Sequence, residues 1–364
     1  MYPKRGKTGN ISATSFRGYL HSPPAKNNRK YIRIYVDSLR NLPAAPSLVP
    51  LKIISSGAAL PAHKVTSAEL DVRLGKSAGY VQQRSGVEYR FHGDDRASQV
   101  QLAVAAITDA LERGNIAADS VDLLIFASAI PVQALPYSAA HVLKASPLRE
   151  GISTFDVNAS CVSFISALQV AAGLLNTGAY QRIAIVSAEL ASRGINWAHE
   201  ESSIILGDGA ACAIVEQGDG RSGILSCLME TYPAGVDLCH IRAGGTRRNP
   251  RAGIVDSDFL FHMDGKRLFR LAAALIEEYW ARLLSAAQCA QGDLAAVVPH
   301  QASHVSLEHM RRRLNIPEDV LKDRHRHHGN QRQQNPGQMS FHPVHGKYRA
   351  RRAVVFRLQP RFIT

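Results

Sequence analysis

From residue 51 onward, short apolar runs that are typical of buried strands alternate with longer runs that have helical periodicity. The predicted helices cover 97–116, closed by Gly114, and the start of 266–303, a segment that follows the order of long helix, short connector and buried strand. The predicted strands lie within 51–60, 121–130, 182–190 and 210–217. This alternation predicts an α/β fold built from two similar halves, which meet near residues 218–223.

Length and composition agree with a globular protein. The chain has 364 residues, of which 45% are hydrophobic, and this is enough for two domains or one large α/β unit. No stretch approaches the roughly 18 uninterrupted apolar residues of a membrane span, and the first twenty residues lack the apolar core of a signal peptide. We therefore expect a cytoplasmic protein that does not associate with membranes.

The net charge of +13 is concentrated at the two ends of the chain. Residues 1–50 carry 9 basic side chains and 1 acidic, 51–323 carry 25 and 29, and 324–364 carry 9 and none. A nucleic-acid-binding domain would carry its basic residues on the folded body, so a nucleic-acid partner is not expected. Residues 1–50 mix proline, asparagine and basic residues without periodicity, which predicts a flexible, dispensable leader.

One cysteine lies where a strand pattern gives way to a helix pattern. Cys161 falls in FDVNASCVSF (155–164), and the apolar run 162–178 that follows closes at Asn176, Thr177 and Gly178. At a helix N-terminus, the backbone N–H groups and the helix dipole favour thiolate over thiol and can hold an oxyanion. The alternative is a structural cysteine, because cysteines outside disulfides usually act as small buried hydrophobes.

The other cysteines fit that structural role better. Cys212 lies inside a predicted strand and Cys289 inside a predicted helix. The chain has five cysteines and no C-x-x-C pair, so neither a disulfide framework nor a zinc site is expected, and the thiols should be reduced. The five are Cys161, Cys212, Cys227, Cys239 and Cys289.

A nucleophilic cysteine requires polar partners, and two candidates follow it. His300 ends a predicted buried strand 139 residues after Cys161, and Asn330 follows 30 residues later, next to Gly329. A lone histidine at such a position is more often structural. Papain-like hydrolases also order Cys, His and Asn, with the His ~130–150 residues after the Cys. The C-G-S-C-W context of that family is absent around Cys161.

Four segments in this order resemble β-ketoacyl-acyl carrier protein synthase III, of the thiolase superfamily of chalcone and stilbene synthase-like condensing enzymes. They are DVNASCVSF, LGDGAACAIVE, VVPHQAS and HGN, supported by SGVEYR (85–90), AGGT (243–246) and MDGKRLFRLA (263–272). The resemblance runs from about residue 51 to 330. It implies a five-layered αβαβα thiolase-like fold from two pseudo-repeats, with halves at 51–220 and 221–331, and a homodimer.

The resemblance also implies a catalytic triad of Cys161, His300 and Asn330 and a decarboxylating Claisen condensation. Cys161 would take an acyl group from a coenzyme A or acyl carrier protein thioester. His300 and Asn330 would then stabilise the enolate that forms when malonyl-acyl carrier protein loses carbon dioxide. The product is a 3-oxoacyl thioester for fatty acid or specialised-metabolite biosynthesis. This chemistry requires no metal or redox cofactor, and the sequence offers no strong ligand cluster.

The resemblance implies that Tyr80, Arg84 and Leu135 bind the substrate. The coenzyme A groove of the family uses a Trp and an Arg four residues apart, which correspond here to Tyr80 and Arg84. A further Arg of that groove aligns with Glu200, whose charge would repel phosphates, so coenzyme A is the less expected acyl donor. Leu135 takes the place of a Phe that lines the partner subunit's acyl pocket, and a smaller side chain suggests a larger starter group.

Two groups of charged residues invite a binding role. Lys266, Arg267 and Arg270 begin a predicted helix, and the resemblance implies that they dock the acidic acyl carrier protein. An ordinary solvated helix face would have the same composition. The segment 325–328 (HRHH) lacks a carboxylate or cysteine partner, so we expect a solvated loop there and not a metal site.

The segment 332–364 departs from the family. It shows no α/β periodicity until a short apolar run at 353–356, and it lacks a Gly-rich loop that supplies an oxyanion donor. A shift of one base forward permits Ala-Ser-Lys-Ile-Pro from Arg332, directly after Gln331, and Gly-Phe-Ser-Arg-Gly-Leu-Ser from Arg357. We therefore predict an aberrant tail that is read in a shifted frame, which the nucleotide sequence will test.

Alternatives remain for this tail and for the whole chain. The tail could instead be a natural basic segment that binds a partner. If the frame is shifted, the chain lacks its final strand and one oxyanion donor, and it should be poorly stable and nearly inactive. The alternative function is therefore a catalytically defective synthase-like partner subunit or a truncated gene product.

Overall fold

The structure is a computed structural model, and it describes residues 48–301, 303–322 and 352–355. The chain divides into two compact units, Met1–Ala44 and Ala45–Thr364, and every described residue belongs to the second. Strand β1 (Val49–Pro50) pairs antiparallel with β9 (Gly223–Ile224). The predicted leader of residues 1–50 is therefore too long, because its last two residues form a strand of the second unit.

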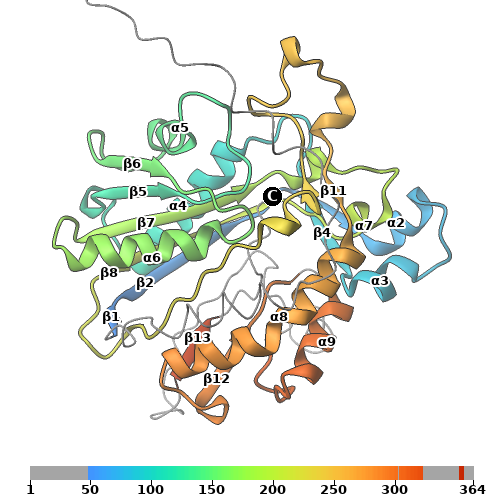
Figure 1. The fold of residues 1–364 in the computed structure, drawn as a ribbon. Coiled ribbons are helices and arrows are strands. Elements are labelled where there is room, and N and C mark those ends of the chain that lie inside the picture. The colour runs from blue at the N-terminus through green and yellow to red at the C-terminus, as the bar shows by residue number, and fades with distance from the viewer. Residues whose placement is uncertain (1–47, 302, 323–351, 356–364) are drawn as a thin grey trace, which may run out of the picture. The chain divides into compact units, whose positions relative to one another are not determined.

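A five-stranded mixed sheet forms the centre of this unit (Figure 1). The strand order is β2 (Lys52–Ala59), β8 (Gly209–Glu216), β7 (Arg182–Glu189), β5 (Leu123–Phe126) and β6 (Ser153–Asp156). Strand β5 pairs in parallel with β6 and β7, and Ile125 lies opposite Phe155 and Ile185. Strand β8 runs antiparallel to both of its neighbours.

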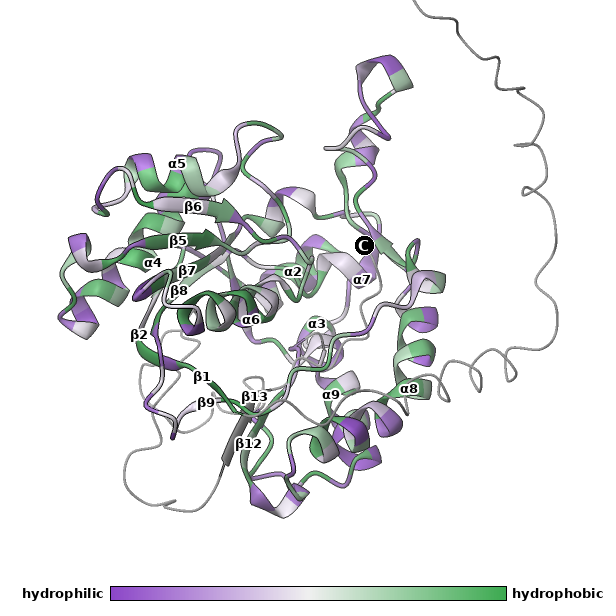
Figure 2. Cartoon of the chain, turned by 60° about the vertical axis from the view of Figure 1, so that its left-hand side comes forward, coloured by the Kyte–Doolittle hydropathy of each residue, from purple (hydrophilic) through white to green (hydrophobic). Residues whose placement is uncertain are grey.

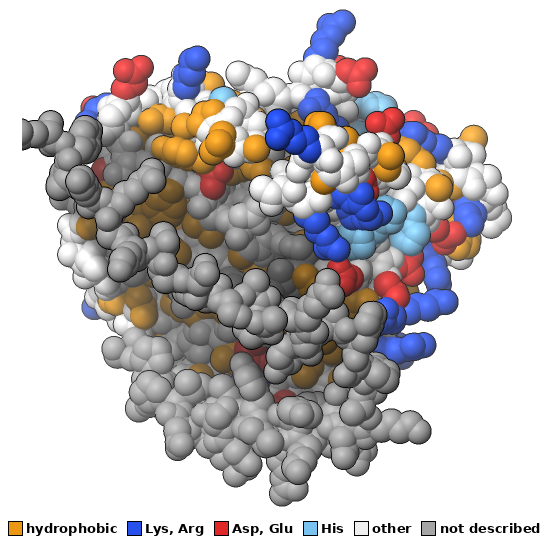
Figure 3. All heavy atoms as spheres, turned by 45° about the horizontal axis from the view of Figure 1, so that its top comes forward, with side chains coloured by type: hydrophobic (Ala, Val, Ile, Leu, Met, Phe, Trp, Pro, Cys, Tyr) orange, Lys and Arg blue, Asp and Glu red, His pale blue; other side chains and the backbone are white. Residues whose placement is uncertain are grey.

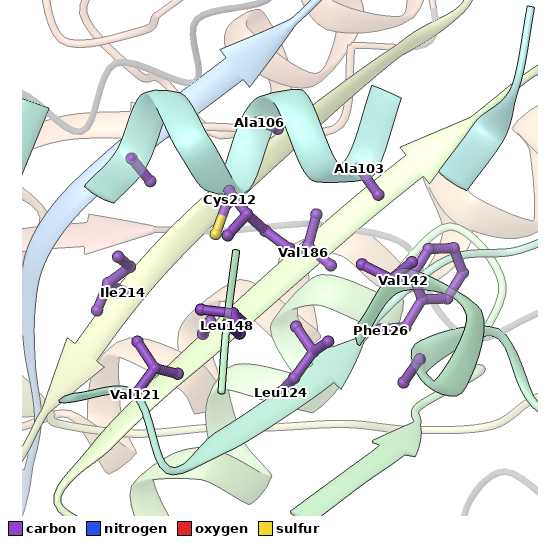
Figure 4. Close-up of a cluster of buried hydrophobic side chains, with 14 of the residues drawn as sticks. Ala103, Ala106, Val121, Leu124, Phe126, Val142, Leu148, Val186, Cys212 and Ile214 are labelled. Carbon is purple, nitrogen blue, oxygen red and sulfur yellow. The ribbon is translucent and has the colours of Figure 1, made fainter. Parts of the chain in front are cut away.

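Helices cover both faces of the sheet because its central strands are apolar on both sides. Leu124 and Phe126 of β5 pack with residues of α4 (Gln99–Gly114) and α5 (Ser138–Ala145) in the cluster of Figure 4. Leu123 and Ile125, which point the other way, pack with α6 (Ser163–Asn176). The predicted strand and helix alternation is thereby confirmed as a helix–sheet–helix arrangement.

Helix α4 lies unusually close to strand β2. A Cβ atom on Gly57 of β2 would lie 2.2 Å from the backbone nitrogen of Ala110, so only glycine fits there. A side chain at Gly114 is also excluded by steric overlap, because its Cβ would lie 2.7 Å from the Cβ of Ser55. The helix ends at Gly114 as predicted, and the left-handed residue that caps it is the next one, Asn115 (φ 49°).

Smaller elements surround the sheet on the N-terminal side. Strands β3 (His63–Thr66) and β4 (Tyr89–His92) pair antiparallel. The chain between these two strands forms α2 (Ser67–Arg73) and α3 (Tyr80–Ser85). Three further short elements are η1 (Ala118–Ser120), which precedes β5, and η2 (Ala191–Gly194) and α7 (Glu200–Ser203), which lie between β7 and β8 in the chain.

The C-terminal half contains a long helix followed by a strand, in the predicted order. Helix α8 (Gly265–Ala286) packs with strand β12 (Leu294–Val298) and helix α9 (His304–Arg313) around buried residues such as Trp280 and Leu294. Hydrophobic and hydrophilic residues alternate along α8, whereas β5 is hydrophobic throughout (Figure 2). The remaining elements are η3 (Pro233–Gly235), β10 (Cys239–His240), η4 (Pro250–Ala252), η5 (Asp256–Phe259), β11 (His262–Met263) and η6 (Gln291–Asp293).

Two expectations for this half need correction. Cys289 is buried, but it follows the end of α8 and does not lie inside a helix. Strand β13 (Arg352–Val355) pairs in parallel with β12 at the short apolar run of the tail, whereas a shifted frame was expected to leave the chain without its final strand. Residues 323–351 and 356–364 lie outside the described residues, and they include the rest of the tail, Asn330 and the histidine segment 325–328. None of the helices in the described part of the chain is long and apolar enough to cross a membrane.

Candidate active site

Cys161 lies in a tight turn between the carboxyl end of β6 and the start of α6. Ser160, directly before it, has a left-handed backbone (φ 52°), which is uncommon for a residue with a side chain. Asn158 holds this conformation, because its Oδ1 accepts from the Ser160 N–H (3.0 Å) and its Nδ2 donates to the Ala129 carbonyl (2.9 Å). The turn is thereby tied to the loop that follows β5.

Ser163, the first residue of α6, holds the same turn from the other side. Its Oγ accepts from the Ala159 N–H (2.9 Å) and donates to the Ser160 carbonyl (2.6 Å). The Cys161 turn therefore lies at the carboxyl edge of the parallel strands β5, β6 and β7. In open α/β sheets this edge is where ligands bind.

The position of Cys161 suits a reactive thiol. It directly precedes the N-cap residue of α6, Val162, and its side chain is half-buried. The N–H groups of the first turn and the helix dipole favour a negative charge at this point.

The structure adds a second cysteine beside the first, which the sequence did not indicate. Cys239 lies in β10, which pairs antiparallel with β11, and its thiol is buried. Burial raises the pKa of Cys239 to about 12, and the charge of nearby Cys161 adds to the increase. Cys239 therefore remains a neutral thiol next to the candidate nucleophile.

His300 lies just beyond the carboxyl end of β12 and is half-buried. The loop that carries it is closed by Gln301, whose Nε2 donates to the Pro299 carbonyl (3.2 Å) and the Lys322 carbonyl (3.1 Å). Asn330 lies outside the described residues. The triad of Cys161, His300 and Asn330 stays a prediction.

The two residues expected at the coenzyme A groove lie on α3, and one of them is bonded to Glu200. The Tyr80 hydroxyl donates to Glu200 Oε1 (2.5 Å), and Lys76 Nζ donates to Oε2 (2.7 Å). The hydrogen bond from Lys76, followed by that from Tyr80, lowers the pKa of Glu200, and the charge of exposed Arg84 adds to this. The expected repulsion of phosphates by Glu200 is thus weakened, because Lys76 pairs with the carboxylate.

Helix α7 brings the candidate binding residues of the two halves to one rim. Glu200 bonds to Tyr80 of α3, while the next residue, Glu201, accepts from the Gly265 N–H at the start of α8 (2.7 Å). Exposed Lys266, Arg267 and Arg270 occupy the first two turns of α8. The groove residues and the predicted docking residues therefore lie on either side of α7.

Leu135 points away from its own chain. Its side chain is 84% exposed, in the loop between β5 and α5, and Ile130 and Tyr137 of that loop are also exposed. The Tyr137 hydroxyl lies 2.9 Å from Thr154 Oγ1 on β6, the edge strand of the sheet. This exposure agrees with a role in a partner's pocket, which stays a prediction.

Comparison with known proteins identifies the family. The family model 3-oxoacyl-[acyl-carrier-protein (ACP)] synthase III matches residues 155–233. A β-ketoacyl-[acyl-carrier-protein] synthase III of Paramagnetospirillum magneticum is 31% identical over 75% of this chain and 84% of the relative. The chain belongs to the 3-oxoacyl-[acyl-carrier-protein] synthase III family.

Other proteins are similar to most of this chain. A 3-oxopimeloyl-[acyl-carrier-protein] synthase of Rhodothermus marinus is 32% identical over 76% of this chain and 82% of its own length. The crystal structure of the Aquifex aeolicus synthase III matches with a TM-score of 0.65 and 27% identity, over 74% of this chain and 83% of that one. The predicted thiolase-like fold and the predicted enzyme class, a 3-oxoacyl-forming acyltransferase, are confirmed.

Proposed function

We propose that this synthase III condenses an acyl thioester with malonyl-acyl carrier protein through an acyl group carried on Cys161. The observation that carries the proposal is the Cys161 turn, held by Asn158 and Ser163 at the carboxyl edge of the sheet and directly before α6. The sulfur attacks the thioester carbonyl carbon, and backbone N–H groups at the helix start stabilise the oxyanion. The donor leaves as a thiolate, which takes up the proton that the Cys161 thiol has lost.

The second half of the reaction begins with malonyl thioester. Loss of carbon dioxide leaves an enolate, and its oxygen accepts hydrogen bonds from His300 Nε2 and the Asn330 amide. The enolate carbon attacks the carbonyl carbon of acyl-Cys161, and the carbon–sulfur bond breaks to restore the thiolate. These steps exchange no electrons with an external acceptor, so we propose that no metal or redox cofactor takes part.

Intact mass spectrometry tests the nucleophile. Incubation of the full chain with an acyl thioester should add one acyl group, which is absent in Cys161→Ala and retained in the matched control Cys239→Ala. An adduct that persists in Cys161→Ala contradicts the assignment. A folded wild-type chain that forms no adduct would favour the synthase-like partner subunit.

A second assay tests whether His300 and Asn330 act in decarboxylation and not in acylation. His300→Ala and Asn330→Ala should abolish the release of labelled carbon dioxide from malonyl thioester, by a factor of about 10² or more, while acylation of Cys161 persists. Loss of acylation with normal decarboxylation would assign them to the first half-reaction instead.

We further propose that the starter acyl group arrives on a carrier protein. Lys76 and Arg84 are close enough to act electrostatically on Tyr80, and Glu200 offsets the charge of Lys76, which leaves little charge for the phosphates of coenzyme A. Acyl-coenzyme A should therefore acylate Cys161 no faster than acyl-pantetheine, which lacks the nucleotide. Glu200→Gln should raise the ratio of the acylation rate with acyl-coenzyme A to the rate with acyl-pantetheine. A wild-type preference for acyl-coenzyme A above about tenfold argues for coenzyme A as the donor.

A homodimer in the cytoplasm completes the proposal. The edge strand β6, with exposed Ile130, Leu135 and Tyr137 beside it, presents the apolar surface that a second copy would cover. Sedimentation should give a dimer for the wild type and a smaller species for Leu135→Asp. The reduced cytoplasm would keep Cys161 as a thiol.

Carrier docking is proposed for Lys266, Arg267 and Arg270 on the exposed start of α8. Glu201 fixes this helix start through the Gly265 N–H, on the same rim as Tyr80. Reversal of these charges should raise the KM for malonyl-acyl carrier protein more than the KM for malonyl-pantetheine.

A further inference from the structure

A separate arm of the chain, residues 241–261, connects β10 to β11 and extends away from the sheet (Figures 1 and 2). Its base is closed by the Ala243 N–H, which donates to the Asp258 carbonyl (2.9 Å). The Phe261 N–H donates to the carbonyl of Gly194 in η2, a turn that follows the carboxyl end of β7 (2.8 Å). The arm is therefore anchored at the same edge of the sheet as the Cys161 turn.

The arm is basic, although the body of the chain is mildly acidic. Residues 241–261 contain four arginines and two aspartates, Asp256 and Asp258. Residues 237–270 carry 7 basic side chains and 4 acidic, while the rest of 51–323 carries 18 and 25. Residues 237–270 thus carry a net positive charge, whereas the rest of 51–323 is net negative, and Figure 3 shows Lys and Arg side chains beside histidines on one face.

These arginines are available to a partner in different degrees. Arg242 lies 3.4 Å from the buried carboxylate of Asp258, and Arg248 donates to the Gly253 carbonyl (2.9 Å). Arg247 and Arg251 are exposed, and no carboxylate among the described residues lies within ion-pair distance of either. The arm therefore presents at least two cationic groups whose charge the described part of the chain does not neutralise.

Apolar side chains accompany this charge. Val255 is 60% exposed and Phe259 is 50% exposed on the same arm. An apolar centre with charged groups around it is typical of a protein–protein contact, whereas a site for a free phosphate has no use for exposed apolar side chains.

We propose that the arm is a docking surface for the acidic acyl carrier protein, with Arg247, Arg248 and Arg251 opposite its carboxylates and Val255 and Phe259 against its apolar side chains. The inference rests on the proposed function, in which a carrier protein delivers malonyl and starter groups. It extends the contact from the start of α8 across β10–β11 to the arm. Opposite charge would steer the carrier to the edge of the sheet that holds Cys161.

The test measures carrier binding without turnover. Fluorescence anisotropy with a labelled holo acyl carrier protein, at low salt and at 0.5 M salt, compares the wild type with Arg247→Glu/Arg251→Glu and with Val255→Ser/Phe259→Ser. The matched control is Arg149→Glu/Arg221→Glu. Both control arginines are exposed, and they lie before the amino end of β6 and after the carboxyl end of β8, at the opposite edge of the sheet.

We expect the arginine variant to bind the carrier roughly tenfold or more weakly at low salt, with a smaller difference at high salt, and the control to stay within about twofold of the wild type. The apolar variant should weaken binding at both salt concentrations. Acylation of Cys161 by acyl-pantetheine should be the same in all four proteins, because this small donor does not reach the arm.

Three outcomes overturn the inference. Carrier binding by the arginine variant equal to that of the wild type does so directly. Loss of dimer in the arm variants alone would assign the arm to contacts between copies, and arm-dependent binding to anionic lipid vesicles without carrier binding would assign it to a membrane surface. A failure of Cys161 acylation in the wild type refutes the proposed function, and the binding result still stands or falls separately.

Discussion

Ser163 holds the backbone on both sides of Cys161. Its hydroxyl is buried, accepts from Ala159 and donates to Ser160, whose left-handed backbone directs the chain into α6. The nucleophile therefore depends on a side chain that need not touch the substrate.

Ser163→Ala should weaken both the fold and the reaction. Loss of the two hydrogen bonds should lower the free energy of unfolding by about 1–3 kcal/mol, and the loosened turn should slow acylation of Cys161. The control is Ser85→Ala, since Ser85 is also buried, donates to the Val81 carbonyl and accepts from the Val87 N–H. Equal acylation rates for the two variants, measured by mass spectrometry, would deny Ser163 a positioning role.

At the scale of elements, the contact between β2 and α4 is set by the absence of a side chain. A Cβ at Gly57 would lie 2.2 Å from Ala110 N and 2.4 Å from Ala106 O, and both of these atoms belong to the helix backbone. Neither atom can move without moving α4. The spacing between helix and sheet therefore depends on one residue.

Gly57→Ala should be strongly destabilising. We expect a loss of about 1–3 kcal/mol or more, which for a domain of this size lowers Tm by roughly 2–4 °C per kcal/mol. Gly173→Ala on α6 is the matched control, because its Cβ would meet nothing within 4 Å, and it should be neutral or slightly stabilising. A small change in Tm for Gly57→Ala would mean that α4 can shift away from the sheet.

Helix α8 is joined to the segment before η3 by Glu230. Arg282 of α8 donates to Glu230 Oε1, and the Tyr232 hydroxyl donates to Oε2. Burial raises the pKa of Glu230, but the hydrogen bonds from Arg282 and Tyr232 outweigh it, so the pKa is lowered. A lowered carboxyl pKa stabilises the fold above its unfolded value, near 4.5, and this contribution disappears as the pH falls through the folded value.

Glu230→Gln should therefore destabilise the protein in a pH-dependent way. At pH 7 we expect a loss of about 1–3 kcal/mol, because Arg282 keeps its charge without the carboxylate. The difference from the wild type should shrink as the pH is lowered below about 4. Thermal unfolding at several pH values measures this, and a difference that does not change with pH would show that Glu230 acts by packing alone.

At the scale of the whole molecule, the boundary between the leader and the folded body can be tested by truncation. A chain that begins at Ala45 keeps β1 and should retain the wild-type Tm. A chain that begins at Leu51 loses the β1–β9 pairing and the packing of Val49 on the α6 side of the sheet, and it should be less stable. Equal Tm values for the two truncations would support the original prediction that the dispensable leader extends to residue 50.

Much of the architecture could be predicted because buried strands and amphipathic helices leave regular patterns in the sequence. The motif around Cys161 also indicated its place before a helix. Contacts between distant segments left no such pattern, as with Cys239 beside Cys161 and Lys76 beside Glu200. The motif that contains Asp208 was recognised, but only the structure shows that its carboxylate accepts from Gly93 and Ser192 and so joins three loops.

The two adjacent glutamates of α7 have a mechanical consequence. Neighbouring residues on a helix point about 100° apart, so Glu200 and Glu201 can hold α3 and α8 at the same time from one short segment. Helix α7 therefore links α3 and α8 at a fixed angle. Neither of these two helices can move outward alone without breaking one of these contacts, and a residue inserted between Glu200 and Glu201 would turn one carboxylate away from its helix.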